Sequence, residues 1–391
     1  MPSILLIVTG SIAAAKALDL AQILKQNNYM LDVILTSAAK EFVTEKQFKK
    51  IGIKNIFSNI FDAEMEDKIG HIELSRKNDL VLIYPATANF IAKAASGLAE
   101  DLATTAILAS DKKVFMAPAM NVAMWHNNAV TENIKKLETR DIDIIYPEKG
   151  QLACGEIGEG RLKEPQDIYQ IIIGYFAFRQ KLAKMNIIVT AGGTREKIDP
   201  VRYIGNFSSG KQGVAIAKKF VEYGARVTLI AAHVTCHIPA NIRILRAESA
   251  LQIQQLIQQE LVKIKYDIGV FSAAIADFRV AEIANHKLKK NILNELNLKL
   301  VKNPDILSEI STKKYRPNIL VGFAAESENL ASNAKEKLKR KNCDYIVANN
   351  ILANEVFASD KNDILLLSQK ATLTCKDSKE KIADFIIKNI I

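Results

Sequence analysis

Short runs of apolar residues recur along the chain, and most of them are followed by a stretch with a helical period. In the first half, the apolar runs occupy residues 3–8, 31–36, 80–84, 113–117 and 142–146, with helical patterns at 14–26 and 88–110. Continuous apolar runs of this length are typical of parallel strands whose two faces are both covered by helices. The first half is therefore predicted to fold as an α/β domain with a mainly parallel sheet.

The second half repeats this alternation of strands and helices. Its predicted strands are 187–190, 226–231, 242–245, 267–272, 318–323 and 344–348. Its predicted helices lie near 212–224, 248–263 and 331–341. A hairpin at 363–367 and 371–375 is predicted to precede a closing helix from about Ser378. The helical segment 165–185 is the predicted junction, which gives domains at 1–180 and 181–391.

Both halves open with the same pattern, an apolar strand followed by a turn of small residues and then a helix. Residues 4–8 lead into Thr9-Gly10-Ser11, and residues 187–189 lead into Thr190-Ala191-Gly192-Gly193-Thr194. A helix N-terminus offers unpaired backbone N–H groups to an anion, and ligands of such sheets bind at the carboxyl ends of the strands. Neither turn is a Walker loop or a GxGxxG fingerprint, so packing alone remains an alternative.

Composition and charge narrow the class of protein. The chain has 391 residues, of which 49% are hydrophobic and 25% charged, as is ordinary for a globular protein. No apolar run approaches the ~18 residues of a membrane span, and no basic leader precedes the first strand, so we expect a cytoplasmic protein without a membrane partner. The net charge of +10 is spread along the chain without a nucleic-acid-binding motif, so we expect small phosphorylated ligands and no nucleic acid.

The cysteines and histidines do not form a metal-binding pattern. The four cysteines lack CxxC spacing and are expected to be reduced thiols. His233, Cys236 and His237 lie close together, but no fourth ligand is near them in the sequence, so an exposed loop is favoured over a structural zinc site.

Four groups of residues in the first half lie where such sheets bind ligands. The turn from Gly10 is matched by Thr36-Ser37 after the next strand, and both supply hydroxyls suited to a phosphate. Residues 118–125 read PAMNVAMW, in which Asn121 either caps the next turn or binds a substrate carboxylate. His71 suits proton transfer but could equally be structural. Cys154 lies in a glycine-rich loop at 152–162, which is either a mobile loop or a linker.

Together, the Ser11–Ala14 turn, His71, PAMNVAMW and the loop ACGEIGEGRL make the first half resemble the flavin-dependent cysteine decarboxylases. The resemblance implies a flavodoxin-like or Rossmann-like flavoprotein domain that binds FMN. It implies His71 as the base for substrate oxidation, Asn121 as the ligand of the carboxylate and Cys154 as the later proton donor. Ala15 stands where the family often has Tyr, a position that we expect to pack. The FMN-binding residues implied are Gly10, Ser11, Ile12, Ala13, Thr36, Ser37, Pro85, Ala86, Thr87 and Met120.

The implied chemistry is reasonable in itself. A cysteine amide carboxylate has no nearby electron sink, so direct loss of CO2 would leave an unstabilised carbanion. Oxidation of the carbon–sulfur unit supplies that sink, and a flavin can accept and later return the hydride.

The second half carries a long distinctive loop at 189–213 and several basic segments beyond strand ends. Its motifs TAGGTREKIDPVRYIGNFSSGK, AAIADF, KLKK, KNPDI, GFAAE and KLKRKNCDYIVAN resemble those of the bacterial, CTP-using phosphopantothenate–cysteine ligases. The resemblance implies a Rossmann-like ligase domain with a terminal β-hairpin, although Gly193 and Val280 replace prolines common in the family. An aspartate beside several lysines suits a magnesium triphosphate.

The ligase resemblance assigns roles residue by residue. Asn206 is implied to handle the pantothenate acyl group, Lys287 to steady the triphosphate, and Asp277 to lie near Mg2+. The residues implied around CTP are Ser272, Ala273, Asp277, Lys287, Pro304, Asp305, Ile306, Leu307, Phe323, Lys337 and Lys341.

Together the resemblances imply two consecutive steps of coenzyme A biosynthesis. L-cysteine is joined to 4'-phosphopantothenate through an acyl-cytidylate, and 4'-phosphopantothenoylcysteine is then decarboxylated to 4'-phosphopantetheine. Family analogy implies a homo-oligomer, a dodecamer with paired ligase domains. An NAD(P)-dependent oxidoreductase and a non-catalytic flavin-binding regulatory subunit remain the alternatives.

Overall fold

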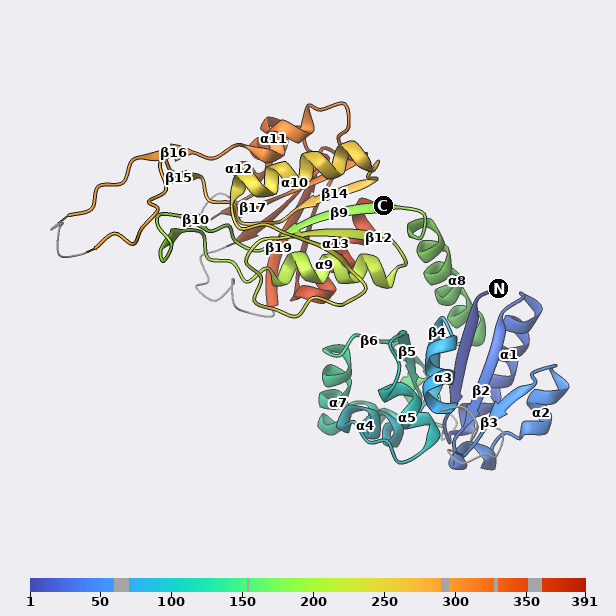
Figure 1. Cartoon of the computed structure of the whole chain (residues 1–391). Helices are drawn as coiled ribbons and strands as arrows, with labels where there is room; N and C mark the ends of the chain where they lie inside the picture. Colours follow the sequence, from blue (N-terminus) through green and yellow to red (C-terminus); the bar gives the residue numbers. More distant parts are fainter. Residues whose placement is uncertain (60–69, 153–154, 290–294, 327–329, 351–360) are drawn as a thin grey trace. The chain divides into compact units, whose positions relative to one another are not determined.

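Figure 1 shows a computed structural model of the chain, which describes residues 1–59, 70–152, 155–289, 295–326, 330–350 and 361–391. The chain divides into two compact units, an N-terminal unit (Met1–Ala177) and a C-terminal unit (Phe178–Ile391). Helix α8 (Pro165–Leu182) runs through this division, and the predicted boundary at 180/181 falls within the same helix. No helix in the described ranges is long and apolar enough to cross a membrane.

The N-terminal unit is built on a six-stranded parallel sheet with the order β3-β2-β1-β4-β5-β6. Its strands are β1 (Ser3–Val8), β2 (Met30–Leu35), β3 (Asn55–Phe57), β4 (Leu80–Ala86), β5 (Lys113–Pro118) and β6 (Ile142–Ile144). The order runs outward from β1 to β3 and then restarts with β4 on the other side of β1. This is the Rossmann order, and its ligand crevice is expected between the carboxyl ends of β1 and β4.

Helices cover both faces of this sheet, as the continuous apolar strands require. One face packs against α1 (Ala15–Gln26), α2 (Glu45–Lys50) and α8. The other packs against α3 (Gly70–Lys77), α4 (Ala88–Ser96), α5 (Leu102–Leu108) and α7 (Asn128–Glu138).

The helical pattern at 88–110 is two helices instead of the single one that the periodicity indicated. Gly97 ends α4 with φ 72°, and Asp101 starts α5 with a capping box that includes Thr104. A left-handed residue followed by a side-chain cap is a strong stop-and-start signal.

The loop around Cys154 contains regular structure that the sequence did not indicate. Strands β7 (Glu148–Gln151) and β8 (Ile157–Arg161) form an antiparallel hairpin beside the short helix α6 (Val122–Trp125). Residues 153 and 154, between the two strands, lie outside the described residues.

The C-terminal unit has an eight-stranded sheet with the order β13-β12-β9-β14-β17-β18-β19-β20. Its strands are β9 (Asn186–Ala191), β12 (Arg226–Ala231), β13 (Arg243–Arg246), β14 (Ile268–Phe271), β17 (Ile319–Glu326), β18 (Tyr345–Asn350), β19 (Lys361–Ser368) and β20 (Thr372–Ser378). The strands pair in parallel as far as β18, and the last two form the antiparallel hairpin. The predicted Rossmann-like domain with a terminal hairpin is confirmed.

Five helices flank this second sheet in the described part of the chain. Helices α10 (Ala250–Lys263), α11 (Ile306–Ser311) and α12 (Leu330–Arg340) pack on one face. Helices α9 (Lys211–Glu222) and α13 (Lys379–Ile390) pack against each other and lie on the opposite face in Figure 1.

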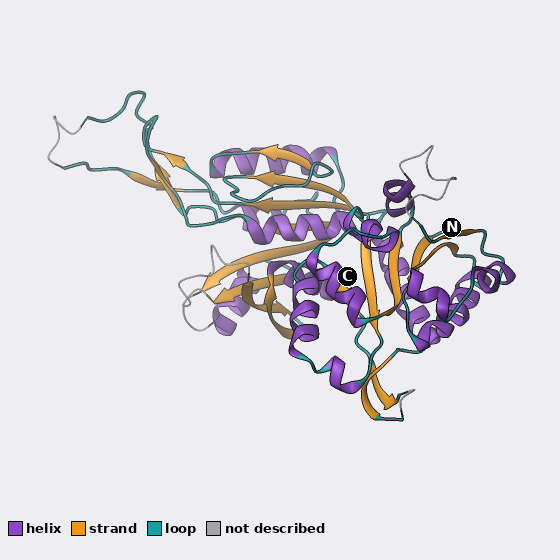
Figure 2. Cartoon of the chain, turned by 90° about the horizontal axis from the view of Figure 1, so that it is seen from below, coloured by secondary structure: helices purple, strands orange, loops and turns teal. Residues whose placement is uncertain are grey.

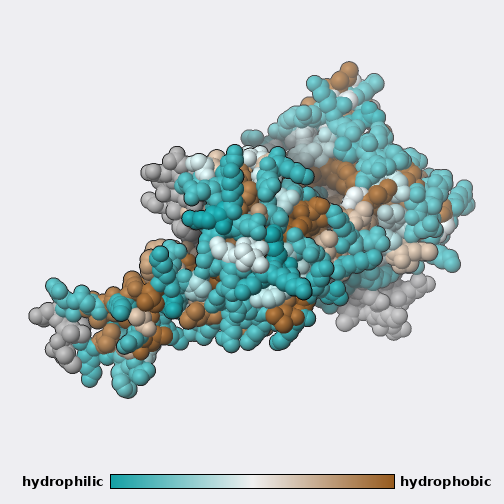
Figure 3. All heavy atoms as spheres, turned by 90° about the horizontal axis from the view of Figure 1, so that it is seen from above, coloured by the Kyte–Doolittle hydropathy of each residue, from teal (hydrophilic) through white to brown (hydrophobic). Residues whose placement is uncertain are grey.

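Two small ribbons stand outside this sheet, as Figure 2 shows. Strands β10 (Glu196–Lys197) and β11 (Tyr203–Ile204) form one, and β15 (Phe278–Val280) and β16 (Leu300–Lys302) form the other. We call residues 278–302 the arm, of which 290–294 are not described. Figure 3 shows hydrophobic residues exposed along the arm, and they include Phe278, Ile283, Leu296, Leu298 and Leu300.

Candidate functional site

Thr9 joins the carboxyl ends of β1 and β4 in the N-terminal unit. Its Oγ1 donates a hydrogen bond to the Pro85 carbonyl oxygen at 2.8 Å and accepts one from the Thr87 N–H at 3.1 Å. The side chain is 2% exposed, so these bonds replace the water that it loses on folding. The loops that follow the two strands are thereby fixed relative to each other at the point where the strand order predicts a ligand.

The turn at Gly10 touches the turn that follows β2. A Cβ atom at Gly10 would lie 2.4 Å from the Ala38 Cβ and 2.8 Å from its carbonyl oxygen, so only glycine fits. Ser11 and Thr36 cap their turns by accepting hydrogen bonds from the Ala13 and Ala39 N–H groups. The two small-residue turns therefore lie side by side, and both line one cavity.

A cavity of about 350 Å³ lies against these turns. Its lining includes six of the ten predicted FMN-binding residues, namely Gly10, Ser11, Thr36, Ser37, Thr87 and Met120. The lining combines hydroxyl groups and turn residues with apolar side chains such as Phe90 and Met124, a combination that fits a phosphate joined to an aromatic ring system. Pro85 and Ala86 are buried and do not line this cavity.

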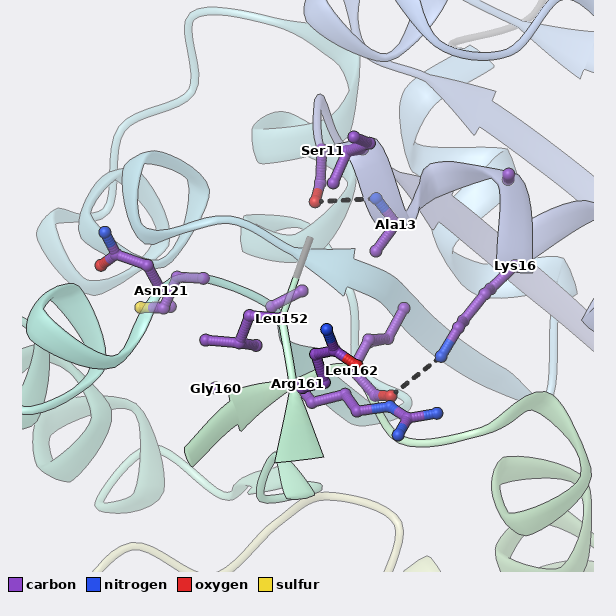
Figure 4. Close-up of a pocket in the computed structure, with 13 residues that line it drawn as sticks. Ser11, Ala13, Lys16, Asn121, Leu152, Gly160, Arg161 and Leu162 are labelled. Atoms are coloured by element: carbon purple, nitrogen blue, oxygen red, sulfur yellow. Dashed lines mark hydrogen bonds between the residues drawn. The ribbon is translucent and has the colours of Figure 1, made fainter. Parts of the chain in front are cut away.

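A second cavity, of about 920 Å³, lies beside the hairpin β7–β8. Figure 4 shows Ser11 and Lys16 facing Leu152, Arg161 and Leu162 of the hairpin and its continuation. The predicted FMN residues Ile12 and Ala13 line this cavity, as does Ala15. Ala15 itself is exposed, and the expectation that the family's tyrosine packs at this position stays a prediction.

Gly160 attaches the hairpin to the loop that carries Asn121. Its carbonyl oxygen accepts a hydrogen bond from the Met120 N–H at 3.1 Å. Its φ is 130°, and a Cβ atom there would lie 2.3 Å from the Met120 carbonyl oxygen. A side chain at this position would separate the hairpin from the loop, so the glycine keeps this wall of the cavity closed.

Asn121 caps the next turn and also lies at the larger cavity, so its role as a carboxylate ligand stays a prediction. Its Oδ1 accepts a hydrogen bond from the Met124 N–H at 2.8 Å and so caps α6, as the structural alternative required. The residue also lines the larger cavity. With Oδ1 engaged in the cap, the Nδ2 donors are the part of the amide suited to a carboxylate.

Lys16 and Arg161 are charged residues of this cavity that the sequence reasoning missed. Lys16 Nζ lies 2.8 Å from Glu164 Oε1, and Arg161 Nη2 lies 2.5 Å from the same oxygen. These hydrogen bonds, led by that from Lys16, lower the pKa of Glu164. A lysine one turn into the helix after a Gly-Ser turn was the available signal.

His71 and Cys154 are not placed by side-chain geometry. His71 falls in α3, with its side chain outside the described set, and Cys154 lies outside the described residues altogether. Their assigned roles stay predictions.

In the C-terminal unit, hydrogen bonds join the loops that follow β9 and β14, which correspond to β1 and β4 of the first sheet. The Ser272 hydroxyl donates to the Thr190 carbonyl oxygen at 2.6 Å, and the Ala273 N–H donates to Thr190 Oγ1 at 3.2 Å. Thr194 Oγ1 accepts from the Ala276 N–H at 3.0 Å. These hydrogen bonds join the loops after both strands, and we call the residues that make them (Thr190, Thr194, Ser272, Ala273 and Ala276) the polar seam. Two predicted CTP residues, Ser272 and Ala273, lie in it.

Hydrogen bonds also link Asn206 and Asp277 to residues of neighbouring loops. Asn206 is exposed, and its Nδ2 donates to the Ile275 carbonyl oxygen at 3.1 Å. The Asn303 N–H donates to the Asp277 carbonyl oxygen at 2.8 Å, which brings the KNPDI segment beside Asp277. Gly193 donates its N–H to the His233 carbonyl oxygen at 3.2 Å, a bond that the proline common in the family could not make.

Asp305 and Lys341, which are 36 residues apart, form an ion pair at the start of α11. Burial opposes ionisation of Asp305, but hydrogen bonds from Lys341 and Ser308 lower its pKa overall. Ile306 packs in the core, whereas Pro304, Leu307, Phe323 and Lys337 are half-buried. Asp277 and Lys287 are exposed.

No three His, Cys, Asp or Glu side chains converge on a common point within the described ranges. A cation at Asp277 would therefore take most of its ligands from the nucleotide phosphates and water, as Mg2+ usually does.

The fold is that of a two-domain, doubly wound α/β protein, and predicted site residues lie at the switch point of each sheet. Residues 1–177 match the family model "Flavoprotein", and residues 182–391 match "DNA/pantothenate metabolism flavoprotein C-terminal domain". The coenzyme A biosynthesis bifunctional protein CoaBC of Haemophilus influenzae is 42% identical over 381 residues, covering 97% of this chain and 94% of the relative. The chain belongs to this family of bifunctional coenzyme A biosynthesis enzymes, in which a decarboxylase flavoprotein domain is joined to a ligase domain.

Two solved structures correspond to the separate halves. A C-terminal domain of a CoaBC protein is 32% identical and covers 54% of this chain and 96% of its own, with a TM-score of 0.44. A PPC decarboxylase mutant in complex with pantothenoylaminoethenethiol is 31% identical and covers 45% of this chain and 98% of its own, with a TM-score of 0.41.

Proposed function

We propose that the C-terminal unit joins L-cysteine to 4'-phosphopantothenate with CTP, and that the N-terminal unit decarboxylates the 4'-phosphopantothenoylcysteine formed. The observation that carries the decarboxylase half is the shared wall of the two cavities. Ser11, Ala119 and Met120 line both, so ligands in the smaller and larger cavities would meet at these residues. A cofactor and a substrate that exchange a hydride need this contact.

In the decarboxylase, the protein's own groups hold and orient the substrate. Asn121 Nδ2 donates to the substrate carboxylate, and Oδ1 stays in the α6 cap, so the amide cannot rotate freely. FMN, when bound in the smaller cavity, accepts and returns the hydride. His71 takes the substrate proton during oxidation, and Cys154 supplies the proton for the final reduction, as the family resemblance implies.

In the ligase, the seam between β9 and β14 supports a nucleotide site. Ser272 and Ala273 hold the loop against Thr190. Asp305 and Lys341 form the ion pair at the start of α11, Phe323 belongs to β17 and Lys337 to α12. Asp277 binds Mg2+ with the triphosphate, Lys287 offsets its charge, and Asn206 binds the acyl carboxylate. Activation as an acyl-cytidylate supplies the leaving group that amide formation needs, so no enzyme nucleophile is required.

The setting of both reactions follows the family. We propose a cytoplasmic homo-oligomer, a dodecamer with ligase domains in pairs, and small molecules as its partners. The exposed hydrophobic residues of the arm are compatible with burial between copies of the chain.

Each half reaction has its own test. Protein given 4'-phosphopantothenoylcysteine without CTP should release CO2, and protein given 4'-phosphopantothenate with CTP and Mg2+, without cysteine, should release pyrophosphate. Asn206→Asp should block only the second reaction, and Cys154→Ser should release CO2 but accumulate the oxidised ene-thiol. A colourless protein that oxidises NADPH and ignores both substrates would instead support the oxidoreductase alternative.

A further inference from the structure

The segment Ile198–Arg202 forms a tight turn at the tip of the ribbon β10–β11. The Ile198 N–H donates to the Arg202 carbonyl oxygen at 2.9 Å and closes the turn. Asp199 Oδ1 accepts from the Val201 and Arg202 N–H groups, both at 2.8 Å. Asp199 Oδ2 accepts from Arg202 Nε at 3.0 Å and from its Nη2. Both carboxylate oxygens therefore accept hydrogen bonds, which replace the water that Asp199 loses because it is only 1% exposed.

The same turn is hydrogen-bonded to the arm through the backbone N–H and the backbone carbonyl oxygen of one residue, Leu288. Asp199 Oδ2 accepts a hydrogen bond from the Leu288 N–H at 3.2 Å, and Arg202 Nη2 donates one to the Leu288 carbonyl oxygen at 3.0 Å. A third bond runs from the Ala284 N–H to the Ile198 carbonyl oxygen at 3.0 Å. Residues 89 positions apart in sequence are thus joined where the arm would otherwise be open loop.

Leu288 adjoins Lys287, which is exposed and makes no ion pair with any described residue. The turn that holds Leu288 belongs to the ribbon whose second strand, β11, ends two residues before Asn206. Asn206 is itself hydrogen-bonded to Ile275 beside the nucleotide seam. One ribbon therefore fixes the backbone next to Lys287 and leads directly to Asn206.

We propose that Asp199 is a positioning residue of the ligase, which sets Lys287 relative to Asn206 by fixing the backbone of Leu288. This inference rests on the proposed ligase function, in which Lys287 meets the triphosphate. Asp199 does not touch substrate in this role and acts through Lys287 alone.

Asparagine at position 199 tests this role with little change of shape. Oδ1 and Oδ2 both accept from N–H donors, so the amide nitrogen of Asn would face a donor in either orientation. One side of the network is then lost whichever way the amide turns. Asp363→Asn, at an exposed ion pair with Lys376 in the terminal hairpin, is the matched control.

Trypsin tests the contact in the absence of the ligase substrates. It can cleave the peptide bond between Lys287 and Leu288, and the N–H of Leu288 in that bond donates a hydrogen bond to Asp199. In Asp199→Asn we expect cleavage there to be roughly 5- to 150-fold faster, the factor for loss of a buried hydrogen-bond network. Cleavage after Lys370, in the turn of the terminal hairpin, should stay unchanged and serves as the internal reference. Unchanged cleavage after Lys287 would overturn the proposal.

A double-mutant cycle reports on the catalytic consequence. Pyrophosphate release from CTP and 4'-phosphopantothenate should fall at least roughly tenfold in Asp199→Asn, and less than about twofold when the same change is made in Lys287→Ala. Equal losses in both backgrounds would mean that Asp199 does not act through Lys287. A wild-type protein without CTP-dependent pyrophosphate release would contradict the ligase function, while the trypsin result would still decide the contact.

If Asp199→Asn does not fold, Arg202→Gln takes its place in both experiments. It removes the bond to the Leu288 carbonyl oxygen from a side chain that is 42% exposed, where substitution is better tolerated. The same increase in cleavage and the same dependence on Lys287 are expected. Their absence in a folded Arg202→Gln protein would overturn the proposal.

Discussion

Gly10→Ala should distort the proposed FMN site, because the added methyl group has no room. It would lie 2.4 Å from the Ala38 Cβ and 2.8 Å from the Ala38 carbonyl carbon and oxygen, and these backbone atoms cannot rotate away. Overpacking of this kind costs about 1–3 kcal/mol. A domain of this size loses roughly 2–4 °C in melting temperature for each kcal/mol, so we expect a decrease of about 2–12 °C for the N-terminal unit.

The assay is the flavin absorbance per chain of the purified protein, followed by thermal unfolding with and without added FMN. Because the two turns that we propose to bind the FMN phosphate are pushed apart, flavin content should fall and added FMN should restore less stability than in the wild type. Gly174→Ala is the matched control, since a Cβ atom there meets nothing within 4 Å and alanine favours the α8 helix. Full flavin content and an unchanged melting temperature in Gly10→Ala would refute the geometry of this site.

Three further substitutions test the substrate-binding role of Asn121 and the contributions of Glu260 and Glu164 to stability. Asn121→Asp keeps an oxygen for the α6 cap but presents a negative charge to the substrate carboxylate, so decarboxylation should be lost while flavin absorbance stays normal. Glu260→Gln weakens the buried bonds with Arg243 and Tyr266 and should lower the free energy of unfolding of the C-terminal unit by about 1–3 kcal/mol, measured by urea denaturation. Because the pKa of Glu164 is lowered, its stabilisation is present above its ordinary pKa of 4.5 and is lost as the pH falls through the lowered value. Glu164→Gln should therefore lower stability at neutral pH by less than about 1 kcal/mol and reduce its loss in acid; an unchanged acid transition would show that Glu164 is not paired.

Long apolar strands and their order of appearance were predictable from the sequence. β1 is an almost continuous apolar run and β12 is mainly apolar after the exposed Arg226, and these patterns identify both strands without tertiary information. β3 was missed because its three residues are exposed or half-buried, and β10 and β15 because ribbons of two or three residues leave no periodicity. The predicted helix at 88–110 runs through Gly97, whose left-handed conformation ends α4 instead.

The candidate sites were predictable only in part, for a related reason. Turns such as Gly10–Ala14 follow strands directly, so their location at the sheet edge follows from strand order. The position of Lys16 in the larger cavity depends on Leu162 and Glu164, almost 150 residues away, and no local pattern reports such a contact. The contact between Asp199 and Leu288 is of the same kind.

The central claim is that one chain performs both steps, and a single incubation tests it most directly. The purified protein is mixed with 4'-phosphopantothenate, L-cysteine, CTP and Mg2+, and pyrophosphate, CO2 and 4'-phosphopantetheine are measured over time. We expect pyrophosphate to appear first and CO2 and 4'-phosphopantetheine to follow in equal amounts. Pyrophosphate without CO2, or neither product from a flavin-loaded protein, would contradict the account.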